Sequence, residues 1–195
     1  TDSAGFSMTG NDLRNSVSSL ISDIQSVPQG TRIATLLPDM PMTAISLMAL
    51  VHHVQILPIN PVLNESEILN ILLDAKVQTL LANKQDALAK SLASRANIPI
   101  STLSNTGELN LPIINGTSQS AGLVLLTSGS TGKPKRVPLT PEQLHLSASR
   151  IAKSLQLGPT DRAIHALPMF HIGAIVDLLL APLSAGGSVH FAGGM

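Results

Sequence analysis

Residues 123–135 read Leu-Val-Leu-Leu-Thr-Ser-Gly-Ser-Thr-Gly-Lys-Pro-Lys, which joins a short apolar run to a polar, glycine-rich segment. The apolar run 123–126 predicts a buried strand. The segment 127–135 that follows holds four hydroxyl side chains, two glycines and two lysines. Glycines let main-chain N–H groups turn toward a ligand, hydroxyls add donors, and lysines neutralise negative charge. The stretch therefore predicts a phosphate-binding loop directly after a buried strand.

This loop differs from the P-loop of the nucleoside triphosphatases. A solvated turn is the commoner explanation of a Ser/Thr/Gly cluster, but the preceding strand and the two lysines favour a ligand-binding loop. The P-loop requires Gly-x-x-x-x-Gly-Lys-[Ser/Thr] followed at once by a helix. Here the glycines are only three residues apart, Pro134 follows Lys133, and the next helix start is expected at Thr140. The loop must therefore bind phosphate without a helix N-terminus behind it.

Composition narrows the class of protein. The chain has 195 residues, of which 44% are hydrophobic, and this suits a folded globular chain. Only 12% are charged, so we expect an unusual share of neutral or apolar surface. Lysine plus arginine equals aspartate plus glutamate, so no nucleic-acid partner is expected, and the lack of cysteine excludes disulfides. No segment is long enough for a membrane span and no signal peptide opens the chain, so the expected location is intracellular and cytoplasmic.

Strands and helices are expected to alternate along the chain. The predicted strands are 31–37, 55–59, 77–82, 98–102, 123–126, 161–167 and 188–191. The predicted helices are 9–26, 42–53, one that begins at Asn64, 86–96, 140–155 and 173–184. This order favours an α/β fold with mostly parallel sheets and helices on both faces. We expect an amino-terminal subdomain over 1–118, with a linker at 104–120 and a possible short strand at 111–114, and an incomplete second subdomain over 119–195.

The ten residues 126–135 resemble the phosphate-binding signature of the adenylate-forming enzymes, which are acyl- and aryl-CoA synthetases, peptide-synthetase adenylation domains and luciferases. Residues 30–61 resemble the opening βαβ unit of the same family, so the resemblance implies the amino-terminal part of its large domain. Arg136 departs from the family, which usually has glycine there, and is expected to point to solvent. The residues that the resemblance places at the ATP phosphates are Thr127, Ser128, Gly129, Ser130, Thr131, Gly132, Lys133 and Lys135.

A second segment, 167–173, resembles the part of the family that lies beside the carboxylate substrate. In many acyl- and aryl-CoA synthetases an aromatic-His pair occurs there, as Phe170 and His171 do here, whereas amino-acid-activating domains tend to carry an aspartate pattern. The resemblance implies catalytic roles for His171, between substrate and phosphate, and for Thr127, near the α-phosphate. A buried structural histidine is the alternative, and the position downstream of the phosphate loop favours the functional role. His52, His53, His145, His165 and His190 lack metal-ligand spacing, so we expect core or surface roles and no metal site.

The implied function is ATP-dependent activation of a small-molecule carboxylic acid as an acyl-adenylate, with Mg²⁺ as the partner of ATP and coenzyme A as the acceptor. By the resemblance, the adenine and ribose segments and a carboxy-terminal lobe with a catalytic lysine belong to a longer protein, so residues 1–195 alone are expected to be inactive. One alternative is an adenylation domain that loads a carrier protein. Others are a non-catalytic nucleotide-binding module and an α/β fragment whose loop is empty.

Overall fold

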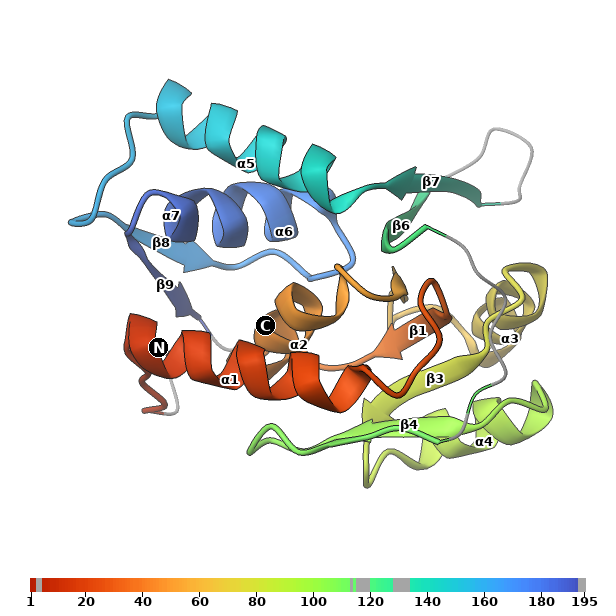
Figure 1. Ribbon diagram of the computed structural model, residues 1–195. Coiled ribbons are helices and arrows are strands. Elements are labelled where there is room, and N and C mark those ends of the chain that lie inside the picture. The colour runs from red at the N-terminus through yellow and green to blue at the C-terminus, as the bar shows by residue number, and fades with distance from the viewer. Residues whose placement is uncertain (3–4, 113, 115–119, 128–133, 193–195) are drawn as a thin grey trace.

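The computed structural model describes residues 1–2, 5–112, 114, 120–127 and 134–192, and seven strands form its first sheet (Figure 1). The strands are β1 Arg32–Leu36, β2 Gln55–Pro58, β3 Thr79–Asn83, β4 Ile100–Leu103, β5 Leu109–Asn110, β6 Gly122–Thr127 and β7 Lys135–Leu139. Their order is β5-β4-β3-β1-β2-β6-β7. The five inner strands are parallel, and β5 and β7 pair antiparallel at the two edges. The expected mostly parallel α/β arrangement is confirmed.

Helices cover both faces of this sheet, as expected. Consecutive strand residues point to opposite faces, and β2 shows the consequence. Ile56 belongs to a core cluster with residues of α1 (Gly10–Ile24) and α2 (Pro41–Leu50). The next residue, Leu57, belongs to a cluster with residues of α3 (Glu65–Asp74) and α4 (Ala87–Arg95). Both side chains are buried, which explains why the strands read as continuous apolar runs and not as alternating ones.

Three helices begin with a capping box, in which the N-cap side chain and the third helical residue exchange hydrogen bonds with each other's main chain. The pairs are Thr9 with Asp12 in α1, Asn64 with Glu67 in α3, and Thr140 with Gln143 in α5 (Pro141–Ser154). Each of these three helix starts lies where the sequence predicts it.

The first sheet and the helices that cover it form the first layer of the structure, and the chain after β7 forms the second layer. It contains α5 and a parallel pair of strands, β8 (Arg162–His165) and β9 (Ser188–Phe191). Between these strands the chain forms α6 (Ile172–Ile175), a π-helical turn η1 (Val176–Leu180) and α7 (Ala181–Ser184), so the helix expected over 173–184 is present and contains a π-helical turn that the sequence did not predict. Pro182 has no N–H, and its ring crowds the carbonyl four residues earlier, so a wider turn relieves the clash. In keeping with this, the Ala181 N–H donates to the carbonyl of Val176, five residues back.

Helix α2 joins the two layers. Nine of its ten residues are buried, and a helix that is apolar all round belongs in a protein interior. Residues of α2 belong to a core cluster that contains residues of the first sheet and also of α5, η1 and β9, and α2 shares a surface hollow with α5 and α7. Over the residues given above, no helix is long and apolar enough to cross a membrane.

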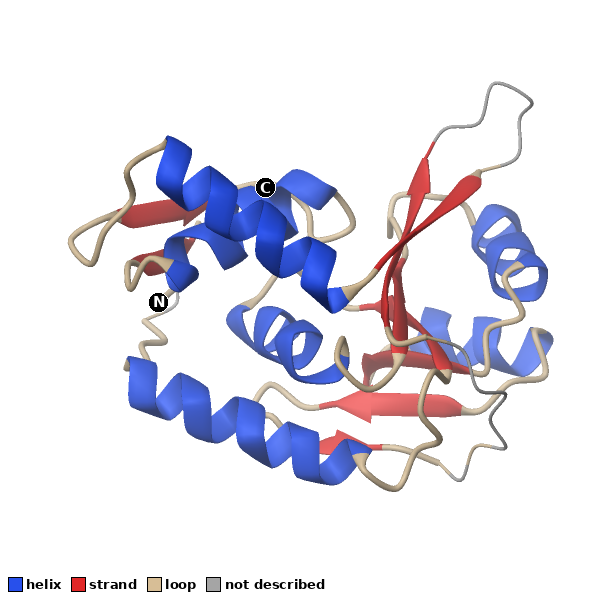
Figure 2. Cartoon of the chain, turned by 45° about the horizontal axis from the view of Figure 1, so that its top comes forward, coloured by secondary structure: helices blue, strands red, loops and turns tan. Residues whose placement is uncertain are grey.

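The structure differs from the sequence prediction at two strands, β7 and β5. Residues 135–139 have no predicted strand, yet they form β7, which pairs with β6 from Thr127–Lys135 to Leu123–Leu139. Figure 2 shows β6 and β7 as a twisted two-stranded ribbon at the edge of the first sheet. The other short strand is β5 at 109–110, and the described residues of the predicted strand at 111–114 are not in a strand.

The sheets divide the chain between β7 and β8, since β6 and β7 belong to the first sheet and β8 and β9 to the second. The boundary between two subdomains at residue 118 stays a prediction.

Candidate functional site

The carboxyl ends of β1, β2 and β6 lie at one edge of the first sheet, because these strands are parallel neighbours. Thr35 of β1 is opposite Pro58 of β2, and Ile56 of β2 is opposite Leu123 of β6. Open α/β sheets bind ligands beyond the carboxyl ends of their strands. The turn that precedes α6 reaches this region, since Met169 and Phe170 line a pocket together with Thr35 and Pro58, and β6 ends with Thr127.

The structure describes the two ends of the predicted phosphate loop. Thr127 is the last residue of β6 and Lys135 the first residue of β7, and they are direct cross-strand partners. Directly opposed residues of an antiparallel pair present their side chains on the same face. Both residues are exposed, so a hydroxyl and an ammonium group lie together on one face of the ribbon. The remaining predicted phosphate-binding residues lie outside the described residues: Ser128, Gly129, Ser130, Thr131, Gly132 and Lys133.

Arg136 is exposed, as the sequence predicts, and it also makes a specific contact. Its Nη1 donates a hydrogen bond of 2.6 Å to the carbonyl of Asp74, the last residue of α3. A cation at this position complements the negative end of the helix dipole. Because adjacent strand residues point to opposite faces, Arg136 points away from the face that carries Lys135.

Phe170 and His171 lie in a tight turn directly before α6. The His171 N–H donates to the carbonyl of Pro168 at 3.0 Å, which closes the turn. The two rings contact each other, with centroids 4.3 Å apart and planes inclined by 46°. Phe170 is half-buried and His171 is exposed. The structure therefore places the imidazole of His171 at the surface, in contact with the ring of Phe170.

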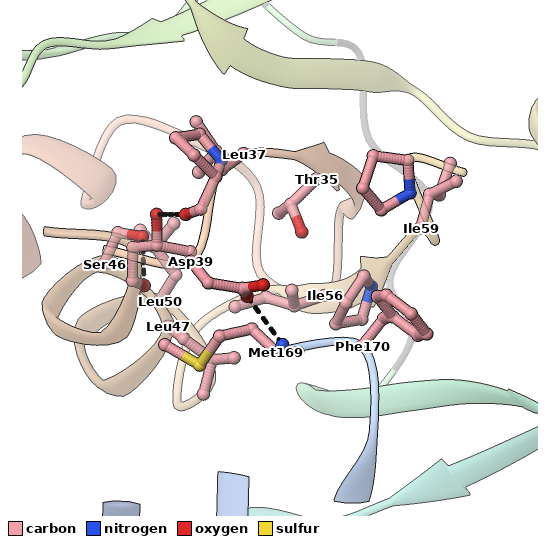
Figure 3. A pocket seen from close by; sticks show the side chains of 14 residues that line it. Thr35, Leu37, Asp39, Ser46, Leu47, Leu50, Ile56, Ile59, Met169 and Phe170 are labelled. Atoms are coloured by element: carbon pink, nitrogen blue, oxygen red, sulfur yellow. Dashed lines mark hydrogen bonds between the residues drawn. The ribbon is translucent and has the colours of Figure 1, made fainter. Parts of the chain in front are cut away.

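A small cavity lies beneath this turn, between α2 and the ends of β1 and β2 (Figure 3). Its volume is about 50 Å³, far below the roughly 300–1,000 Å³ of a ligand pocket, so it is too small for a nucleotide. The polar side chains in its wall are Thr35, Asp39, Thr43 and Ser46. Figure 3 shows the Asp39 carboxylate directed at the main chain of Met169, where its Oδ1 accepts a hydrogen bond of 2.7 Å from the Met169 N–H.

Asp39 was missed by sequence reasoning, which gave no role to the residues between the predicted strand 31–37 and the predicted helix 42–53. Its partner Met169 is 130 positions away, and no local pattern in the chain announces such a pair. The one signal available was position, since Asp39 follows a parallel strand at the edge where functional residues gather.

Of the core or surface roles expected for the five remaining histidines, His165 has a core role. It is buried, its ring stacks on Phe191 with centroids 4.6 Å apart, and its Nε2 lies 3.2 Å from the carbonyl of Ala174 in α6. Burial lowers the pKa of His165 below its ordinary value of 6.5, and the negative charge of Asp39 opposes this shift in part. A neutral imidazole whose Nε2–H donates to Ala174 satisfies this geometry.

The other histidines do not gather with it. His52 and His145 are exposed, and His53 and His190 are half-buried and bonded to Val27 and Thr1. Within the described ranges, no group of three His, Cys, Asp or Glu side chains is placed to hold a metal ion.

The lowered pKa of His165 predicts a pH dependence of stability. The unfolded chain binds a proton at His165 near pH 6.5, and the folded chain binds it only at lower pH. The stability that His165 contributes is therefore complete above pH 6.5 and is lost as the pH falls below that value toward the folded-state pKa. Between about pH 7 and about pH 5, the urea midpoint should fall further for the wild type than for His165→Asn.

His145→Asn is the matched control for this experiment, since His145 is exposed on α5, and it should keep the wild-type pH profile. Equal pH profiles for His165→Asn and the wild type would contradict the assignment.

The sequence and the fold were compared with those of known proteins. The model of the family described as AMP-binding enzyme matches residues 2–195. An oxalate–CoA ligase of Arabidopsis thaliana is 29% identical over 194 residues, which cover 91% of this chain and 38% of the relative. ATP-bound MatB from Rhodopseudomonas palustris superimposes with a TM-score of 0.83 at 19% identity, over 100% of this chain and 42% of that one. MenE from Bacillus subtilis, in complex with ATP and magnesium, superimposes with a TM-score of 0.73 at 24% identity, over 94% and 50%. The chain thus spans about two fifths of the length of the oxalate–CoA ligase and of MatB.

Proposed function

Because the chain belongs to the AMP-binding enzyme family, we propose that it is the amino-terminal part of a longer acid–thiol ligase, here called the parent protein. The parent protein activates a small carboxylic acid with ATP as an acyl-adenylate and then transfers the acyl group to the thiol of coenzyme A. Relatives named as CoA ligases support the acceptor, and the short coverage of their length supports a longer parent.

One observation carries this proposal. The ordered run of hydroxyls, glycines and lysines over 127–135 connects β6 to β7 at the carboxyl edge of the sheet, and its two ends, Thr127 and Lys135, face the same way. A phosphate chain is the ligand that needs donors and positive charge in that combination.

The proposed reaction has two steps, formation of the acyl-adenylate and transfer of the acyl group to the thiol. A carboxylate oxygen attacks the α-phosphorus of ATP, the bond from that phosphorus to the pyrophosphate oxygen breaks, and pyrophosphate leaves. The sulfur of the thiolate then attacks the acyl carbon, and AMP leaves with the electron pair of the cleaved carbon–oxygen bond. In the first step the protein aligns the two reactants and neutralises charge on the departing phosphates. We assign these tasks to residues 128–135, with Thr127 near the α-phosphate.

Mg²⁺ fits this set of residues as a partner of the nucleotide. The described segments carry no carboxylate cluster of the kind that holds a metal in an all-protein site, so the phosphates and water would supply most of its ligands. When bound, the ion supplies further neutralisation of phosphate charge.

His171 is the proposed contact to the reacting carboxylate. Its exposed imidazole, directed by the ring of Phe170, can donate a hydrogen bond to an acyl oxygen. His171→Ala in the parent protein should lower kcat for acyl-adenylate formation by about 10-fold, because one hydrogen bond to the reacting group is lost. His145→Ala on α5 is the matched control and should keep the wild-type rate. Equal kcat values for His171→Ala and the wild type would remove His171 from the reacting centre.

The proposal is tested by the products that the parent protein forms from ATP, an acid and coenzyme A. Equimolar AMP, pyrophosphate and acyl thioester are expected, whereas ADP and phosphate would contradict it. Acyl transfer to a carrier protein, and not to coenzyme A, would identify the adenylation domain that loads such a carrier. Nucleotide binding without acid-dependent products would identify the non-catalytic module.

Residues 1–195 alone are proposed to be inactive, since the chain covers only 42% of MatB. Acid-dependent ATP–pyrophosphate exchange by the 195-residue chain would overturn this part of the proposal and leave the assignment of the parent protein intact.

A further inference from the structure

A single hydrogen bond ties the turn that carries Phe170 and His171 to the first sheet. Asp39 Oδ1 accepts it from the Met169 N–H at 2.7 Å, across the boundary between the two layers. Met169 is buried and Asp39 is half-buried, so water competes poorly for either group. Hydrogen bonds from a neutral N–H to an ionised acceptor are shorter and stronger than neutral ones.

The acceptor side of this bond is fixed. Asp39 follows Pro38, whose carbonyl accepts a bond of 2.6 Å from the Thr43 hydroxyl in the first turn of α2. Helix α2 is itself buried between the two layers. The main chain at Pro38 and Asp39 is therefore anchored to the first turn of α2.

The donor side is part of the candidate site. Met169 lies between Pro168 and Phe170 in the turn that the His171 N–H closes. In the second layer, buried His165 bonds the carbonyl of Ala174, in the first turn of the helix that follows. The Phe170–His171 turn is thus held between a carboxylate of the first layer and an imidazole of the second.

We propose that Asp39 is a positioning residue, which sets the place of Phe170 and His171 relative to the sheet edge where β6 ends. This inference rests on the proposed function. Asp39 does not touch the reacting groups and acts through the main chain of Met169. Displacing a catalytic group by about 1 Å can cost as much as 100-fold in rate, so a distant clamp has a measurable effect.

The test uses the parent protein with Asp39→Ala, which removes the acceptor, and Asp39→Asn, which keeps an oxygen at Oδ1. Asp39→Ala should lower kcat for acid-dependent ATP–pyrophosphate exchange by about 10-fold or more and leave KM for ATP within about twofold, since the phosphate loop is untouched. Asp39→Asn should keep kcat within about threefold of the wild type. Asp23→Ala removes an exposed carboxylate from α1 and should match the wild type in both constants.

Hydrogen exchange at the Met169 amide gives a readout that needs no activity. Protection should be lost in Asp39→Ala and kept in Asp39→Asn. Asp39→Ser serves as a second truncation if the alanine variant does not fold, because serine keeps a turn-forming hydroxyl but is too short to reach Met169.

Wild-type kcat in Asp39→Ala or Asp39→Ser, or equal losses in the alanine and asparagine variants, would overturn the proposal. Failure of the wild-type parent protein to exchange with any acid would overturn the proposed function, and with it the catalytic consequence. In that case, hydrogen exchange at the Met169 amide would still show whether Asp39 holds the turn.

Discussion

Lys135→Ala in the parent protein should lower kcat for acid-dependent ATP–pyrophosphate exchange by about 100-fold, the cost typical of removing one preorganised charge or donor from a developing anion. Lys135 begins β7 opposite Thr127, so its main chain is fixed by the strand pairing and its ammonium lies on the face that carries the Thr127 hydroxyl. Negative charge moves onto the departing pyrophosphate in the transition state, and a fixed cation stabilises that charge without reorganising.

Two further variants sharpen this experiment. Lys135→Arg keeps the charge but changes its shape and reach, and should recover part of the lost rate. Lys153→Ala removes an exposed lysine from the last turn of α5 and should leave the exchange rate unchanged. If Lys135→Ala and Lys153→Ala behave alike, the ribbon end at Thr127 and Lys135 has no role in phosphate binding.

Gly122→Ala should lower the free energy of unfolding by about 3 kcal/mol or more, through a forbidden contact and a strained main chain. Gly122 opens β6 with a φ of +146°, a value that residues with a Cβ rarely adopt. A Cβ there would lie 2.3 Å from the carbonyl oxygen of Leu139 and 3.3 Å from its carbonyl carbon. Both atoms belong to main chain that is paired in β7, so neither can move aside cheaply.

Gly10→Ala is the matched control, since a Cβ at Gly10 meets nothing within 4 Å and the residue opens α1. It should leave the free energy of unfolding unchanged or raise it slightly, because alanine favours the helix. Urea denaturation of both variants measures the difference. A Gly122→Ala protein as stable as Gly10→Ala would show that β6 and β7 do not approach as closely as described here.

The parts of the fold that sequence reasoning predicted are those with local causes. A capping box needs only two residues three positions apart, so the starts of α1, α3 and α5 were readable from Thr9, Asn64 and Thr140. The buried strands were readable because both of their faces are covered and their apolar runs are therefore continuous.

The missed elements have non-local causes. Strand β7 is an exposed edge strand that contains Pro138, and such a strand shows no apolar alternation; its conformation comes from pairing with β6. The π-helical turn depends on how one turn accommodates Pro182. The Asp39–Met169 bond joins two layers through a main-chain donor, which has no side-chain signature at all.

For the candidate site, the sequence predicted which residues take part, and the structure adds the faces on which their side chains lie. Thr127 and Lys135 share one face of the ribbon, whereas Arg136 turns to the other face and binds the end of α3. The roles assigned to 127–135 and to His171 remain predictions that the variants above test.

Acid-dependent exchange of label between pyrophosphate and ATP, measured with the wild-type parent protein and Mg²⁺, tests the central claim most directly. The panel should span small dicarboxylic acids such as oxalate, short aliphatic acids and aromatic acids. We predict that label from pyrophosphate enters ATP only when a suitable acid is present, without any requirement for coenzyme A. Exchange that is independent of acid, or no exchange with any member of a broad panel, would contradict carboxylate activation by this protein.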